Sequence, residues 1–177
     1  MSDVRSESDL TLTGLPALGG ALDLLRLIWA VDHALQRRSK SMAVALGITG
    51  PQRLVIRIIG RFPSIHAKQL ADILHLHPSS LTALLKRLER RGLIRRRPDG
   101  RDRRRLLLGL TRQGQALNSE TPGAIEAAVQ RTLETVSDRD LQGARVTFGV
   151  LARTLDRAEP AERRNQRRRP RVMGAGV

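Results

Sequence analysis

The spacing of apolar residues predicts a mainly helical chain with one small hairpin, and its first element is a long helix. Between residues 18 and 47, apolar side chains recur every three or four positions, for example at Leu24 and Ile28. A second apolar edge of the same helix includes Leu25 and Trp29. Because one apolar stripe usually suffices to cover a small domain, we expect the second edge to pack against another copy of the chain.

Two short helices are predicted next. The first begins with a capping-box sequence at Thr49 and ends before Pro63, which cannot continue a helix. A brief extended link at Ser64 and Ile65 leads to the second helix, which we expect within residues 66–76.

A third helix is predicted from Pro78 to Gly92. Proline is tolerated in the first turn, and glycine favours the left-handed conformation that follows a helix end. Leucines spaced as Leu81, Leu85 and Leu88 predict one buried face. The opposite face is small and polar at its start and basic toward its end, which is suited to contact with a polyanion.

A hairpin is predicted after this helix. Residues 93–97 and 104–110 are short strand-like runs, and Pro98, Asp99 and Gly100 lie in the turn between them. Further on, Thr111 is placed to cap a helix that must break near Pro122. The helical period resumes in residues 125–136 and again in a last helix from Ser137, so apolar stripes lie near both ends of the chain.

Positive charge is concentrated on the third helix and the hairpin. Residues 86–105 hold eleven Lys or Arg and three acidic residues, in a chain of net charge +15. Such clustering favours a nucleic-acid partner, although a charge run can also be the solvated face of an ordinary helical domain. The only aromatic residues are Trp29, Phe62 and Phe148, too few for a reader of single strands that stacks bases.

Two helices joined by a tight turn and followed by a basic hairpin predict a winged helix-turn-helix. The major groove admits one helix, whose small polar start can reach base edges while basic residues further along hold phosphates. An arginine-rich wing can enter the neighbouring minor groove. The expected fold is therefore mainly α with a small β-hairpin wing, a winged helix-turn-helix lobe plus terminal dimerisation helices.

The hairpin also resembles a known family. The run from Asp99 to Thr111, followed by Gly114, is similar to the wing signature of the MarR (multiple antibiotic resistance regulator) family, and residues 79–94 resemble its recognition helix. That resemblance implies a homodimer on a pseudo-palindromic operator, in which Asp99 orients Arg101 in the minor groove. The chain departs from the family at Ala83, where arginine is frequent, and at Lys86, where aspartate is common.

The expected organisation and DNA-binding residues follow from these observations. The segments are a flexible N-terminal arm at 1–17, a dimerisation helix at 18–47, a winged helix-turn-helix domain at 48–111, C-terminal dimerisation helices at 112–158 and a basic, disordered tail at 159–177. The DNA-binding residues are Ser79, Ser80, Thr82, Lys86, Arg87, Arg90, Asp99, Arg101, Arg103 and Arg104.

The resemblance also implies a cavity for a small aromatic or apolar effector between the dimer helices and the DNA-binding lobe. Its candidate lining residues, which could equally be ordinary core, are Trp29, His33, Phe62 and Ile65. The histidines match no metal-ligand spacing, the chain has no cysteine, and no catalytic motif is present, so we expect no metal, no cofactor and no enzyme.

The sequence thus predicts a cytoplasmic, sequence-specific regulator of transcription that binds double-stranded DNA, a dimeric repressor released by a small molecule, with no membrane partner. The alternative is a basic packaging or RNA-associated protein that uses its arginines without sequence choice or ligand response. Equal affinity for a specific and a scrambled duplex would favour the alternative.

Overall fold

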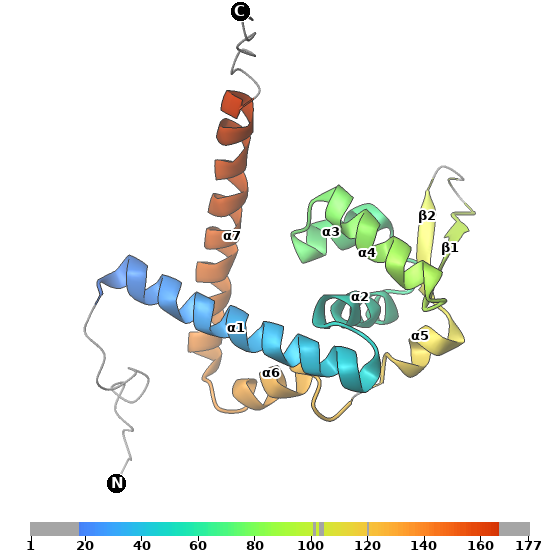
Figure 1. Ribbon diagram of the computed structural model, residues 1–177, viewed down its shortest axis with the longest axis horizontal. Helices are drawn as coiled ribbons and strands as arrows, with labels where there is room; N and C mark the ends of the chain where they lie inside the picture. Colours follow the sequence, from blue (N-terminus) through green and yellow to red (C-terminus); the bar gives the residue numbers. More distant parts are fainter. Residues whose placement is uncertain (1–17, 101, 103–104, 120, 167–177) are drawn as a thin grey trace, which may run out of the picture. The chain divides into compact units, whose positions relative to one another are not determined.

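The computed structural model describes residues 18–100, 102, 105–119 and 121–166, whose elements are labelled in Figure 1. The chain divides into two compact units, residues 1–51 and 52–177. The first unit contains α1 (Gly20–Leu46), which ends at Gly47 with a left-handed φ of 65°. Met42 is its only buried residue, and Ser39 Oγ accepts a hydrogen bond from the Gly50 N–H. The predicted long helix is confirmed, and its apolar side chains are mostly exposed.

The helix α2 (Gly50–Arg61) begins the helical core of the second unit. Val55, Ile56 and Ile59 are buried, whereas Leu54 is about half exposed. Arg53 occupies a position on the same buried face, three residues before Ile56, and it is the one charged residue buried in the described part of the chain.

The helix-turn-helix consists of α3 (Ala67–Leu74) and α4 (Pro78–Arg90), joined at His75, which has a left-handed φ of 49°. The two helices meet through buried leucines, Leu70 on α3 and Leu81, Leu85 and Leu88 on α4. Since α3 is only eight residues long, most of its stability comes from this packing.

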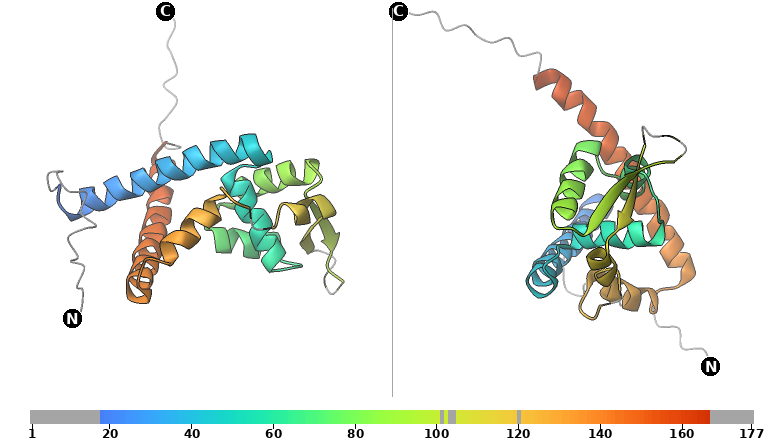
Figure 2. Two further views of the ribbon diagram at one scale, coloured as in Figure 1. Left: turned by 90° about the horizontal axis from the view of Figure 1, so that it is seen from below. Right: turned by 90° about the vertical axis from the view of Figure 1, so that its right-hand side faces the viewer.

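The wing contains β1 (Ile94–Pro98) and β2 (Leu106–Leu110), which pair antiparallel with Arg96 opposite Leu108 (Figure 2). Ile65 and His66 form a third short segment that pairs with β2. Leu108 N–H donates to Ile65 O, and His66 forms an antiparallel bridge with Leu107. The prediction of an extended link over Ser64 and Ile65 was wrong at Ser64. Ser64 has a φ of 72°, and this turn aligns the following two residues with β2.

The short helix α5 (Arg112–Ala116) lies against β2 and against Leu93, which follows α4. Thr111 caps it as predicted, since its Oγ1 accepts from Gly114 N–H at 3.1 Å. The same hydroxyl donates to Gly92 O at 2.6 Å. Gly114 is buried so close to Leu93 that only a residue without a side chain fits there.

Two further helices follow in the described residues. As predicted, the helix breaks before Pro122, and it resumes as α6 (Ile125–Leu133) and α7 (Asp138–Gln166). Ser137 Oγ accepts from Asp140 N–H at the start of α7. The helix extends past the boundary expected at residue 158, while residues 167–177 of the predicted tail and the predicted arm at 1–17 lie outside the described residues.

Within the described residues, no single helix is both long and apolar enough to cross a membrane. The bent pair formed by α1 and α2 passes that test together, by length and composition only.

Candidate nucleic-acid interface

The exposed face of α4 carries the predicted base-reading residues. Ser79, Ser80, Thr82 and Lys86 are all exposed. His77 caps the helix, because its Nδ1 lies 2.8 Å from Ser79 Oγ and 3.4 Å from Ser79 N. Thr82 Oγ1 donates to Pro78 O at 2.7 Å. The start of the helix is thus fixed by side-chain contacts, while its small polar side chains remain accessible to a ligand.

The far end of α4 is basic and is fixed by a Schellman ending. Gly92 N–H donates to Glu89 O, and Leu93 N–H donates to Leu88 O, as this motif requires. Arg87 and Arg90 are exposed on the last turn, and their charge is favourable near the carboxyl end of a helix dipole. Their contact with phosphates stays a prediction.

Two arginines of β1 hold the wing against the helix-turn-helix instead of extending freely. Arg96 Nε lies 3.1 Å from Glu89 Oε2 of α4. Arg97 Nη2 donates to Ser64 Oγ at 2.7 Å. Each contact joins the wing to a helix or to the turn before α3, so the orientation of the wing is linked to that of the recognition helix.

The wing tip is closed by backbone hydrogen bonds. Asp99 N–H donates to Arg105 O at 2.9 Å, and Arg105 N–H donates to Asp102 O at 2.8 Å. Asp99 Oδ2 also lies 3.9 Å from His66 Nε2, which links the tip to the third short segment of the sheet. Arg101, Arg103 and Arg104 lie outside the described residues, so the pairing of Asp99 with Arg101 stays a prediction.

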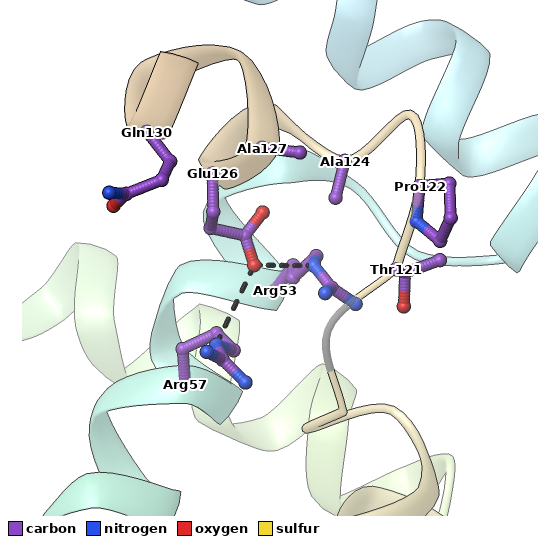
Figure 3. A pocket seen from close by; sticks show the side chains of 8 residues that line it. All are labelled: Arg53, Arg57, Thr121, Pro122, Ala124, Glu126, Ala127 and Gln130. Atoms are coloured by element: carbon purple, nitrogen blue, oxygen red, sulfur yellow. Dashed lines mark hydrogen bonds and ion pairs between the residues drawn. The ribbon is translucent and has the colours of Figure 1, made fainter. Parts of the chain in front are cut away.

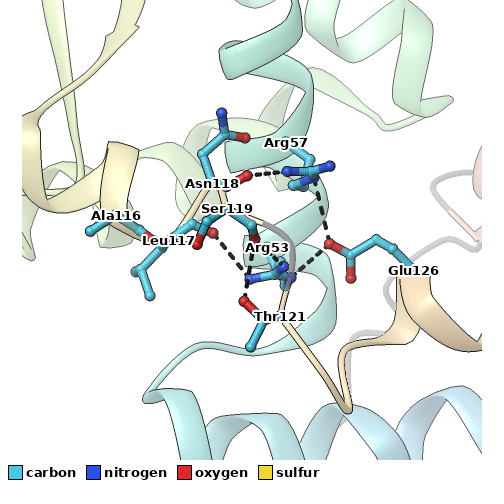
Figure 4. A network of polar contacts seen from close by, with 8 residues as sticks. All are labelled: Arg53, Arg57, Ala116, Leu117, Asn118, Ser119, Thr121 and Glu126. Carbon is cyan, nitrogen blue, oxygen red and sulfur yellow. Dashed lines mark hydrogen bonds and ion pairs between the residues drawn. The ribbon is translucent and has the colours of Figure 1, made fainter.

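A buried arginine that the sequence analysis missed lies at the centre of the second unit. Arg53 is 2% exposed and donates to Glu126 Oε1 at 2.7 Å, to Leu117 O at 3.0 Å and to Ser119 O at 2.9 Å (Figure 4). Arg57 donates to Asn118 O from the next turn of α2. These contacts attach α2 to the segment between α5 and α6.

A cavity of about 560 Å³ adjoins this network (Figure 3). Its lining comes from α2, from the segment before α6 and from the first turns of α6. The lining residues are Arg53, Arg57, Thr121, Pro122, Ala124, Glu126, Ala127 and Gln130.

None of the four residues expected to line an effector pocket lines this cavity. On α1, Trp29 is 66% exposed and His33 is also exposed. In the second unit, Phe62 is 51% exposed, whereas Ile65 is buried and its carbonyl pairs with β2. The structure thus accounts for Ile65 as a core residue, and the role of all four in effector binding stays a prediction.

Among the described residues, no group of three or more His, Asp or Glu could hold a metal ion. What the structure does assemble is an exposed helix with a polar start and a basic end, flanked by a two-stranded basic wing. A helix of this kind beside such a wing defines a winged helix-turn-helix protein of the class that binds double-stranded DNA.

Comparison with known proteins identifies the family. A sequence model of the MarR family matches residues 46–105. The organic hydroperoxide resistance transcriptional regulator of Bacillus subtilis (strain 168) is 30% identical over 132 residues, which are 73% of this chain and 86% of that protein. The HTH-type transcriptional repressor MdtR of the same organism is 29% identical over 123 residues, 69% of this chain and 77% of that one. The chain belongs to the MarR family and is a DNA-binding transcription regulator.

Solved structures have the same fold. The S. aureus MepR–DNA complex aligns with a TM-score of 0.61 at 21% identity, covering 77% of this chain and 99% of that one. A mutant MarR from E. coli complexed with operator DNA aligns with a TM-score of 0.59 at 23% identity, covering 74% of this chain and 94% of that one. The family expected from the wing and the recognition helix is confirmed.

Proposed function

We propose that this regulator is a cytoplasmic, homodimeric repressor that reads a pseudo-palindromic operator and is released when a small molecule binds. The observation that carries the proposal is the presence, in one chain, of a basic recognition helix with its wing and of terminal helices with exposed apolar side chains. Trp29 and Val31 on α1 and Phe148 on α7 are each at least half exposed, an arrangement that a second copy would cover. No catalytic role is proposed.

The relatives support the regulatory part of the proposal. MdtR of Bacillus subtilis is a transcriptional repressor. The regulator PcaV of Streptomyces coelicolor, which aligns with a TM-score of 0.59 at 24% identity, has been solved in complex with its natural ligand. A ligand releases DNA only to the extent that it binds one arrangement of the two lobes better than the other.

In this proposal each predicted DNA-binding residue has a role. Base edges in the major groove are contacted by Ser79, Ser80, Thr82 and Lys86. Phosphates are held by Arg87 and Arg90. The wing contacts the minor groove and its phosphates through Asp99, Arg101, Arg103 and Arg104.

The homodimer is tested by size-exclusion chromatography with light scattering. We expect twice the chain mass of 19.6 kDa at micromolar concentration, because the exposed apolar side chains of α1 and α7 require a partner surface. A monomer under these conditions would contradict the proposed mechanism, which needs two lobes at a fixed spacing.

The proposed role of the wing in operator binding is tested by the substitution Arg101→Ala. An arginine in a narrow minor groove contributes to the recognition of sequence and shape, so we expect operator affinity to fall by about 2 kcal/mol, roughly thirtyfold. Affinity for a scrambled duplex should fall much less. Arg131→Gln, a charge removal on an exposed position of α6, is the control and should leave both affinities unchanged. An Arg101 variant with full operator affinity would refute the assigned role of the wing.

A further inference from the structure

The exposed face of α4 has an alanine near its centre. Opposite the buried leucines of this helix, four exposed residues recur every three or four positions and form one stripe, which we call the α4 stripe: Ser79, Ala83, Lys86 and Arg90. Ala83 occupies the second position of the stripe and presents a single methyl group. The helix backbone can therefore approach another surface closely there, and the contact that results is apolar.

The hydroxyl groups at the start of α4 are already engaged within the helix. Thr82 Oγ1 donates its one hydrogen to Pro78 O at 2.7 Å, so it presents an acceptor oxygen and a methyl group to a ligand. Ser79 Oγ lies 2.8 Å from His77 Nδ1. Lys86 is exposed, and it is the first residue of the α4 stripe whose side chain offers several hydrogen-bond donors.

The charge on Lys86 selects among the four bases. Its ammonium group has three donors and no acceptor. Glu89, the one acidic residue of α4, lies off the stripe and pairs with Arg96 of the wing at 3.1 Å. In the major groove guanine presents two acceptors, O6 and N7, whereas adenine and cytosine each present an amino donor. Guanine is therefore the base that Lys86 complements best.

The methyl group of Ala83 has one complement among the bases. Thymine alone presents an apolar group, its C5-methyl, in the major groove. Contact between two methyl groups removes both from water, whereas a polar base edge in the same place would lose its own hydrogen bonds. Thr82 adds a second methyl group next to that of Ala83, because its hydroxyl is bonded back to the helix.

We propose that Ala83 is a specificity-determining residue, which reads a thymine through its C5-methyl group, and that Lys86 reads a guanine in the same half-site. The inference rests on the proposed function, since it requires α4 to lie in the major groove of an operator. It adds Ala83 to the residues that contact DNA, and it assigns one combination of bases to the α4 stripe.

Selection of bound duplexes from a random library, with the full chain, tests both assignments. We expect every selected half-site to contain one thymine and one guanine whose preferences depend on these two residues. Ala83→Gly should lower the preference for the thymine about fourfold, the factor that burying one methyl group corresponds to. Lys86→Gln should replace the guanine with adenine, because an amide group matches adenine N6 and N7. Ala116→Gly, at an exposed alanine of α5, is the matched control and should select the wild-type sequence.

Replacing that thymine with uracil in one half-site tests the methyl contact itself, because uracil lacks only the C5-methyl group. The wild-type chain should bind the uracil duplex about fourfold more weakly, and Ala83→Gly should bind the two duplexes equally. Each comparison uses one protein and two duplexes, so any loss of helix stability in the glycine variant cancels. An Ala83→Gly variant that loses the same factor as the wild type would overturn the proposal.

The selection separates this inference from the proposed function. A chain that enriches no sequence refutes the sequence-specific regulator on which the inference rests. A chain that enriches a defined sequence, but selects the same thymine and guanine after either substitution, refutes the assigned bases alone.

Discussion

Replacing Arg53 with methionine is expected to lower the free energy of unfolding by about 3 kcal/mol. Methionine is long enough to fill most of the space, so a cavity is a minor part of the loss. The major part is the removal of a charge-assisted bond to Glu126 and of the donors to Leu117 O and Ser119 O. Without them, the segment before α6 loses its two hydrogen bonds from Arg53 and keeps the one from Arg57 to Asn118 O.

Urea unfolding at fixed protein concentration measures this loss, with Arg57→Met as the matched control. Arg57 is one third exposed, its contact with Glu126 is 3.7 Å long, and it donates to one backbone carbonyl, Asn118 O, where Arg53 donates to two. Its loss should therefore cost less, about 1 kcal/mol. If the two variants were equally stable, the buried arginine would not be the anchor of this segment.

The second large effect is expected from Gly114→Ala. A Cβ atom built on Gly114 would lie 1.9 Å from Leu93 O, a backbone atom that cannot turn away. Either α5 or the turn after α4 would have to shift, and we expect a loss of about 3 kcal/mol in the free energy of unfolding. Because Thr111 bonds to Gly92 O in the same place, the shift should also disturb the base of the wing.

Gly109→Ala is the control for this substitution, since its Cβ would meet only Arg95, at 3.9 Å. That contact is an ordinary one, and a residue with a side chain suits a strand better than glycine does, so its stability should be unchanged or slightly higher. Equal stability of the Gly114 and Gly109 variants, measured by thermal unfolding, would show that the close approach of α5 to Leu93 is incorrect.

The elements with strong local signals were predictable from the sequence. The recognition helix has Pro78 in its first turn, leucines on one face and Gly92 after its end, and the structure confirms each of these signals. The wing strands were predicted within two residues of their observed ends, because a short strand-like run on each side of the turn residues Pro98–Gly100 predicts a hairpin.

The parts that depend on distant contacts were not predictable. Ile65 and His66 join the sheet only because the turn at Ser64 aligns them with β2, and two residues are too few to show a strand period. Arg53 finds its partners more than sixty residues away, so no local pattern indicates its burial. The one available signal was a charged residue placed three positions before Ile56 on an apolar face.

The central claim, a regulator that reads its own operator, is tested most directly by one binding measurement. The wild-type chain is titrated at physiological salt with a duplex from upstream of its own gene and with a scrambled duplex of the same length and composition. The account predicts that the first binds about a thousandfold more tightly, as sequence-specific proteins do. Equal affinities would contradict it and would instead indicate a basic protein that binds nucleic acid without sequence choice.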